Sequence, residues 1–186
     1  MRSTAETTFS RICAPGAAIF ALIDAARDGL GPSEAEQAGL TCWSLFDGDL
    51  GDLLKDAAPH LVEFPARSPF RDWWFSRWGD SVGVLVESPV SVAELRRHFR
   101  TLTMVRDAER RQYYFRFYDP RVLRTFLPAC TPEELARFFG PITCFYCEGD
   151  SGRELLAFSV DRDGRLSTRT IPTPYSEAPR AGAASL

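Results

Sequence analysis

The densest group of side chains that could do chemistry lies in the stretch "YYFRFYDPRVLRTFLP", residues 113–128. Arg116 stands inside an aromatic run, and Asp119 and Arg121 follow it closely. These charges could gather around a substrate, in a small hydrolase or ligand-binding enzyme built around Arg116, Asp119 and His60. Such an enzyme also needs a nucleophile or a general base close by, and the stretch supplies neither.

Each residue of this stretch also has a structural role. A strand over residues 113–118 would place Arg116 between Tyr114 and Tyr118 on one face, because side chains alternate along a strand. A guanidinium in that position can stack between the two rings and pair with a carboxylate. We therefore favour an architectural role for Arg116 over a catalytic one.

The next residues predict a short helix. Asp119 is suited to the N-cap, where its carboxylate accepts from the N–H groups of the first turn, and Pro120 is suited to the first helical position. Arg121 and Arg124 then lie on one side of this helix and have no evident partner in the sequence.

Other candidate chemistry is weak. Cys144 and Cys147 have a redox or metal spacing, but zinc needs four ligands and no second pair follows. In a strand these two cysteines point to opposite faces and cannot easily hold one metal ion together. We therefore expect both cysteines to be core residues. Neither histidine, His60 or His98, has a serine or cysteine at motif spacing.

The sequence also lacks the motifs of common cofactor sites. The acidic loop "DGDLGDLLKD", residues 47–56, lacks the spacing and closing glutamate of an EF-hand. No phosphate-binding glycine loop and no dinucleotide fingerprint are present. We expect no cofactor and no metal.

Composition narrows the class of protein. The 186 residues suggest one domain or two small lobes that share a core, and the net charge of −3 argues against a dedicated nucleic-acid binder. The longest strongly apolar run, residues 17–23, is far shorter than the roughly 20 residues that cross a bilayer. Five scattered cysteines and no visible secretory signal predict a cytoplasmic protein that inserts into no membrane.

Apolar periodicity and turn residues predict the elements that position these side chains. The expected strands are "AAIFALID", "TCWSLFDGD", "PHLVEF", "SVGVLVE", "YYFRFY", "ITCFYCE", "RELLAFSVD" and "RLSTRTI". Ser68, Ser91 and Thr131 are expected to cap helices. The fold class is α/β, a mixed β-sheet with packed helices over residues 15–171, in one compact unit or in two lobes split near residue 105. Residues 1–14 are expected to be flexible, and the tail 172–186 to be disordered.

The helix expected over "SPFRDWWFSRWG" carries an unusually wide aromatic arc. Its members are Phe70, Trp73, Trp74, Phe75 and Trp78. Either this helix is wedged between two packed layers, or part of the arc faces a partner. We predict that Phe75 reaches the surface beside Arg71. A protein-binding surface would then comprise Phe75 and Arg71 together with Arg121 and Arg124, since arginine and aromatic residues dominate binding hot spots.

The order of several short motifs resembles a known family. "RFYDPRVLRTFLP" is followed by "FFGP", and it is preceded by "FALIDAAR", "LFDG", "APHLVEF" and "GVLVESPVSVAELRRHFRTL". Over residues 17–147 this order is similar to that of the type VI secretion adaptor or effector-chaperone family, long labelled a domain of unknown function. The resemblance implies a non-enzymatic bacterial protein that binds the N-terminal region of a toxic effector and helps to load it onto the spike protein of the secretion needle.

We therefore expect a cytoplasmic adaptor that hands a protein client to a secretion apparatus. Two alternatives from other classes stay open. One is the small hydrolase or ligand-binding enzyme described above, and the other is an immunity protein that blocks a toxin.

Overall fold

The computed structural model describes residues 18–46, 54, 57–107, 109–152 and 154–172. The predicted flexible N-terminus, residues 1–14, lies outside this range, as do the four aspartates of the acidic loop 47–56. Of the predicted disordered tail 172–186 only Pro172 is described, and the prediction is wrong for this residue, which ends a strand.

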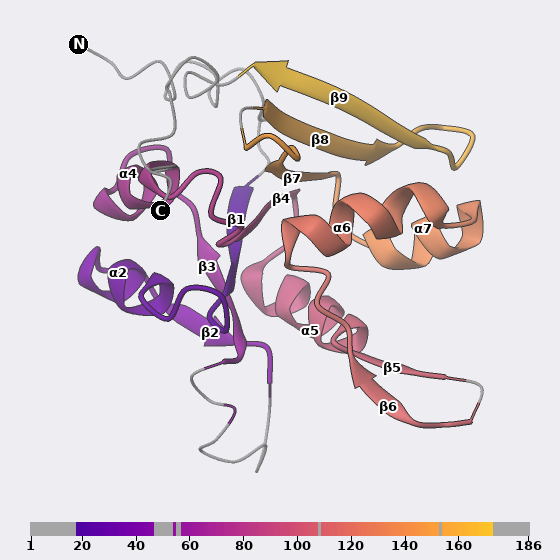
Figure 1. Cartoon of the computed structure of the whole chain (residues 1–186), viewed down its shortest axis with the longest axis horizontal. Coiled ribbons are helices and arrows are strands. Elements are labelled where there is room, and N and C mark those ends of the chain that lie inside the picture. Colours follow the sequence, from indigo (N-terminus) through magenta and orange to yellow (C-terminus); the bar gives the residue numbers. More distant parts are fainter. Residues whose placement is uncertain (1–17, 47–53, 55–56, 108, 153, 173–186) are drawn as a thin grey trace, which may run out of the picture.

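The core of the fold is a seven-stranded sheet with the strand order β2-β3-β1-β4-β7-β8-β9 (Figure 1). Its strands are β1 (Ala18–Asp24), β2 (Cys42–Ser44), β3 (Pro59–Glu63), β4 (Gly83–Ser88), β7 (Cys144–Glu148), β8 (Glu154–Val160) and β9 (Leu166–Pro172). The expected α/β class is confirmed, but the sheet is antiparallel rather than mixed, because every pairing between its neighbouring strands is antiparallel.

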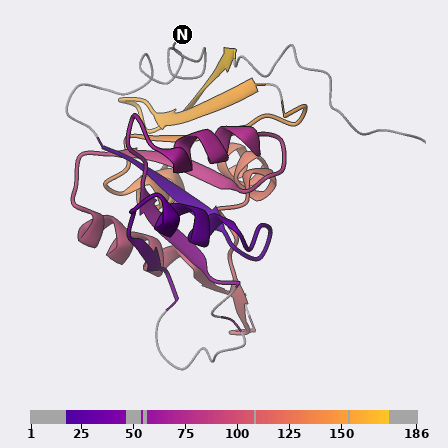
Figure 2. The ribbon, with the colours of Figure 1, turned by 90° about the vertical axis from the view of Figure 1, so that its left-hand side faces the viewer.

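Helices cover both faces of the sheet. One face carries α2 (Gly31–Gln37) and α4 (Pro69–Ser76), which lie in front of the sheet in Figure 2. The other face carries α5 (Val92–Leu102), α6 (Pro120–Phe126) and α7 (Pro132–Phe139), with the 3₁₀ turn η1 (Leu127–Ala129) between the last two. Within the residues described, no helix is both long enough and apolar enough to cross a membrane.

The two faces of the sheet bury two separate hydrophobic clusters. In β1, Phe20 and Leu22 belong to the cluster under α5, α6 and α7, whereas Ala21 and Ile23 belong to the cluster under α2 and α4. This period of two is the strand alternation. It explains why β1 has no polar alternation, as the sequence predicted for a strand buried on both faces.

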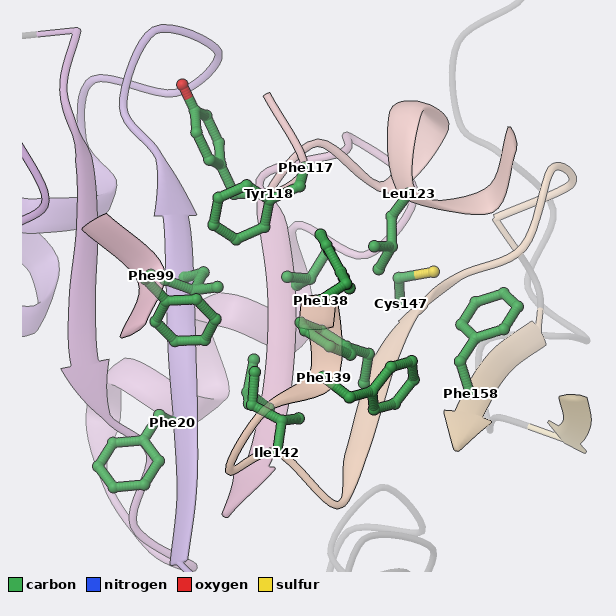
Figure 3. Packing of buried hydrophobic residues seen from close by; sticks show 14 of the residues in the cluster. Phe20, Phe99, Phe117, Tyr118, Leu123, Phe138, Phe139, Ile142, Cys147 and Phe158 are labelled. Carbon is green, nitrogen blue, oxygen red and sulfur yellow. The ribbon is translucent and has the colours of Figure 1, made fainter. Parts of the chain in front are cut away.

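Aromatic rings fill the cluster under α5, α6 and α7 (Figure 3). Phe117 stacks on Phe99 at 5.6 Å between ring centroids, and it meets the edge of Phe138 at 5.7 Å. Phe138 in turn lies 5.2 Å from Phe145 of β7. These contacts join helices α5 and α7 to the sheet through the segment before α6.

Side chains cap the helices as the sequence predicted. Ser68 accepts from the N–H of Arg71, Ser91 accepts from that of Glu94, and Thr131 forms a complete capping box with Glu134. Each cap satisfies an N–H group that would otherwise lack a partner at the first turn.

The predicted strand over residues 113–118 is wrong in its extent. β6 covers Gln112–Tyr114 and pairs with β5 (Met104–Arg106) in a two-stranded hairpin apart from the main sheet (Figure 1). A turn follows, closed by the N–H of Asp119 on the carbonyl of Arg116 at 3.0 Å, and it buries both Phe117 and Tyr118. Burial of two successive rings is incompatible with strand alternation, so tertiary packing overrides the local pattern here.

Candidate functional site

Arg116 pairs with Asp24, the last residue of β1. Its Nη2 atom donates to Asp24 Oδ2 at 2.5 Å, and the Asp24 side chain is fully buried while that of Arg116 is 41% exposed. The expected carboxylate partner is therefore present. The predicted placement of Arg116 between Tyr114 and Tyr118 on one strand face is wrong, because β6 ends at Tyr114.

Pairing with Arg116 offsets part of the cost of burying the Asp24 carboxylate. Burial raises the pKa of Asp24, and the hydrogen bond from Arg116 opposes this rise. The same hydrogen bond raises the pKa of Arg116. Tyr118 is buried beside them, and burial raises its pKa to about 12. The Tyr118 hydroxyl is therefore a neutral group at neutral pH.

Asp119 combines a helix cap with an ion pair. Its Oδ1 accepts from the N–H of Arg121 at 2.9 Å and from Arg121 Nε at 3.0 Å, and its Oδ2 accepts from Arg121 Nη2 at 2.6 Å. Burial opposes ionisation of Asp119, but the hydrogen bonds from Arg121 outweigh it and lower the pKa of Asp119. Pro120 occupies the first turn of α6, as predicted.

The prediction that Arg121 and Arg124 lack partners is wrong. Arg121 binds Asp119. Arg124 donates to the Glu148 carbonyl at 2.7 Å and to Asp150 Oδ1 at 2.5 Å, and its side chain is only 15% exposed. The partners of Arg124 lie at the end of β7 and just after it, far along the chain, so local spacing gives no sign of them.

Glu148 joins both sides of the fold at this end of the sheet. Its carboxylate accepts from the Gly79 N–H and from the Ser81 hydroxyl, each at 2.7 Å. Its carbonyl accepts from Arg124 of α6. A single residue of β7 thus holds both the segment after α4 and helix α6.

The predicted exposure of Phe75 and Arg71 is wrong. Phe75 is 7% exposed and Arg71 is 5% exposed. The Arg71 guanidinium lies over the rings of Phe64 and Phe75, at 5.9 and 5.6 Å from their centroids. Phe64 follows β3 and covers this edge of the arc, also contacting Trp74 at 5.7 Å. All five aromatic residues of the arc thus belong to the cluster under α2 and α4 or pack against it.

An exposed apolar surface lies instead on the β5–β6 hairpin. Its large side chains are well exposed: Met104 40%, Val105 42%, Tyr113 47% and Tyr114 43%. Sequence reasoning missed this surface because it placed Tyr113 and Tyr114 in a longer, half-buried strand. The available signal was the charged segment "RDAERRQ", residues 106–112, which is typical of a turn that extends into solvent.

A groove borders the hairpin on the side of β5. Its volume is about 610 Å³, and we call it the β5 groove. It is lined by Thr101, Leu102, Met104, Val105, Arg106, Phe115, Phe126, Glu134, Arg137 and Phe138. Three of these rings form an aromatic wall, with Phe126 at 4.6 Å from Phe115 and 5.2 Å from Phe138.

The cysteines and histidines do not form a reactive cluster in the part of the chain described. Cys144 and Cys147 point into opposite hydrophobic clusters, as predicted, and burial raises their pKa to about 11 and about 12. His60 of β3 is half-buried, and this desolvation lowers its pKa. His98 Nε2 lies 2.9 Å from the Phe138 carbonyl. Among the described residues no group of three or more His, Cys, Asp or Glu could hold a metal ion.

Comparison with known proteins gives one family. Searches of curated proteins and of solved structures found no match. A family model described as a domain of unknown function, DUF4123, matches residues 19–137. This range runs from β1 into α7 and includes the Asp24–Arg116 pair, the hairpin and most residues of the β5 groove. The chain therefore belongs to the DUF4123 family.

Proposed function

We propose that the protein is a non-enzymatic adaptor that binds a type VI secretion effector and promotes its loading onto the spike protein. The DUF4123 family is associated with type VI secretion. The ordered motifs of the chain are similar to those of the adaptor family, as described above. An adaptor must offer an apolar surface to its client, and the observation that carries the proposal is the exposed hairpin beside the β5 groove.

The partners of the charged side chains favour an adaptor over a hydrolase. Arg116 binds Asp24, and Asp119 binds Arg121 while it caps α6. Within the described residues no hydrogen bond or ion pair joins His60 to Arg116 or Asp119. A hydrolase built around these three residues would need them in mutual contact around a substrate.

The proposed mechanism needs neither a cofactor nor turnover. The N-terminal region of the effector would bury apolar side chains against the adaptor in the cytoplasm, and the complex would then meet the spike protein. A few aromatic anchors can supply most of the binding energy of such a contact.

Pull-down of the tagged chain from its native cell, followed by mass spectrometry, tests this proposal. We expect an effector and a spike protein to co-purify. Precipitation of the spike from cells with and without the gene then measures loading, and the effector should accompany the spike only when the adaptor is present. Capture of neither protein would contradict the proposal. Inhibition of a captured toxin's active site would support the immunity alternative instead.

A further inference from the structure

Among the described residues, strand β5 pairs with β6 alone, so its other edge is free. Two backbone hydrogen bonds define the pairing of the hairpin: the Phe115 N–H donates to the Thr103 carbonyl at 3.0 Å, and the Asp107 N–H donates to the Arg111 carbonyl at 3.1 Å. By the strand register, Val105–Tyr113 is the hydrogen-bonded pair between these two. Such pairs alternate with non-hydrogen-bonded ones in an antiparallel ladder. The backbone N–H and C=O groups of Met104 and Arg106 therefore point away from β6.

This free edge faces the β5 groove. Met104, Val105 and Arg106 all line the groove, while none of the β6 residues 112–114 does. Side chains of consecutive strand residues point to opposite faces, so three in a row can line one groove only if the strand edge is turned toward it. Figure 1 agrees, because β5 lies between β6 and the pair of helices α6 and α7.

The groove carries unbalanced positive charge. Arg106 and Arg137 line it and are exposed, and no ion pair joins either of them to a carboxylate in the described part of the chain. Glu134 also lines the groove, but its carboxylate accepts from the Thr131 N–H at 2.7 Å in the capping box. A partner segment with an acidic side chain would complement the two arginines.

We propose that the β5 groove takes an extended segment of a partner protein, which adds as a strand to the free edge of β5. Its apolar side chains would pack on the aromatic wall of Phe115, Phe126 and Phe138, and its acidic side chains would pair with Arg106 and Arg137. Main-chain hydrogen bonds supply affinity in this mode of recognition, and the side-chain pockets supply specificity. The inference rests on the proposed adaptor function, of which it names the binding mode.

Synthetic peptides test the chemistry directly. The probe is a blocked octapeptide that alternates valine and glutamate around a central phenylalanine, titrated into the ¹⁵N-labelled full chain. We expect saturable chemical-shift changes and slower amide exchange at Met104 and Arg106. A peptide with lysine in place of glutamate should bind about tenfold more weakly. Absence of binding by the glutamate peptide at millimolar concentration, or shift changes confined to other elements, would overturn the proposal.

Proline variants test the strand edge. Arg106→Pro removes an N–H that points into the groove and leaves the bonds between β5 and β6 intact. Gln112→Pro is the matched control, because Gln112 lies opposite Arg106 and its N–H points to the other edge of the hairpin. Arg106→Gln removes only the charge. We expect Arg106→Pro to weaken peptide binding by about tenfold or more, and Gln112→Pro to bind like the parent.

Equal peptide affinity in Arg106→Pro and Gln112→Pro would overturn strand addition. If Arg106→Pro does not fold, two other measurements test strand addition. The peptide should slow the amide exchange of Arg106 in the parent, and it should bind the Arg106→Gln/Arg137→Gln variant more weakly than the parent; failure of both would overturn the proposal. Light scattering tests whether the free edge of β5 binds a second copy of this chain instead. If the parent is a dimer and Arg106→Pro is a monomer, the edge forms a homodimer interface, and the proposal of a different partner protein is overturned.

The pull-down separates this inference from the proposed function. Capture of the effector by Arg106→Pro at the level of the parent would contradict strand addition and leave the adaptor function standing. Failure of the parent to capture any effector would contradict the adaptor function, whatever the peptides do.

Discussion

Among the ion pairs described above, Asp24–Arg116 has the largest expected effect on stability, because its carboxylate is fully buried. Arg116→Ala would leave the fully buried Asp24 carboxylate without its cation. Loss of one partner from a buried pair costs about 3–5 kcal/mol, and we expect the lower end because Arg116 is partly exposed. Urea unfolding measures this change. The double variant Asp24→Asn/Arg116→Ala should recover part of the loss, and a double variant less stable than Arg116→Ala would contradict the pairing.

The Arg116→Ala variant should also change the response to pH. The pKa of Asp24 is already raised by burial, and the variant loses the hydrogen bond that opposes the rise. A raised folded pKa means that the folded state binds the proton more tightly than the unfolded state does. The variant should therefore gain stability relative to the parent as the pH falls from neutrality toward 3.8, the ordinary pKa of the group.

Asp119 should show the opposite dependence on pH. Its Asp119→Ala variant loses the cap and the Arg121 ion pair, for which we expect about 1–2 kcal/mol, whereas Asp119→Asn keeps a cap acceptor and should lose less. The folded pKa of Asp119 lies below its ordinary 3.8, so this stabilisation is complete above that pH and is lost as the pH falls through the folded pKa. Urea unfolding across this pH range checks it. A stability difference that persists well below the folded pKa would contradict the assignment.

At the level of single residues, the sequence predicted what depends on near neighbours in the chain. The cap at Asp119 and the "FFGP" stop follow from adjacent residues. Gly140 has φ +50°, and a Cβ there would lie 2.5 Å from the His98 ring. The partners of Arg116 and Arg124 could not be predicted from the sequence. Asp24 and Glu148 are far from these arginines along the chain, and only the fold brings each pair together.

Substitutions on the exposed β5–β6 hairpin can change client binding without changing the stability of the fold. Val105 and Tyr113 lie opposite each other on it, and both are well exposed. The variant Val105→Ser/Tyr113→Ser should change the free energy of unfolding by less than about 0.5 kcal/mol per residue, as is usual for surface sites. It should also lose about tenfold or more in affinity for the captured effector, if the hairpin supplies anchors.

Leu30→Ser is the matched control for that variant. Leu30 is an apolar residue that is even more exposed, at 58%, but it precedes α2 and does not line the β5 groove. Isothermal titration of the purified effector should show parental affinity for Leu30→Ser. Equal affinity in the control and in the hairpin variant would place the client elsewhere.

At the level of elements, the sequence predicted most strands and helices because their apolar patterns agree with their packing. β1 and β4 are buried on both faces and read as continuous apolar runs. The hairpin was missed because its two short strands carry exposed apolar side chains, Met104 and Val105 in β5 and two tyrosines in β6, and local propensity assigns such residues to a buried strand. The surface position of Phe75 was also mispredicted, since the covering ring of Phe64 comes from another part of the chain.

The whole molecule is organised around one sheet that divides two hydrophobic clusters. Strands before residue 105 and strands after it join through the pairing of β4 with β7. The Glu148 carboxylate adds a polar contact across the same junction, because it accepts from the Ser81 hydroxyl. A split into two lobes near residue 105 would have to break this pairing, which favours a single cooperative unit.

Equilibrium unfolding followed by two probes tests this cooperativity. Tryptophan fluorescence reports chiefly on the cluster under α2 and α4. Three of the four tryptophans belong to this cluster or pack against it: Trp73, Trp74 and Trp78. Far-ultraviolet circular dichroism reports on all elements, including α5, α6 and α7. We expect the two urea transitions to coincide, because a cluster that unfolds alone would expose the shared strands β1 and β4. Phe117→Ala, which removes a buried ring from the opposite cluster, should shift both transitions together by about 3–5 kcal/mol. A fluorescence transition left in place by Phe117→Ala would show two lobes that unfold independently.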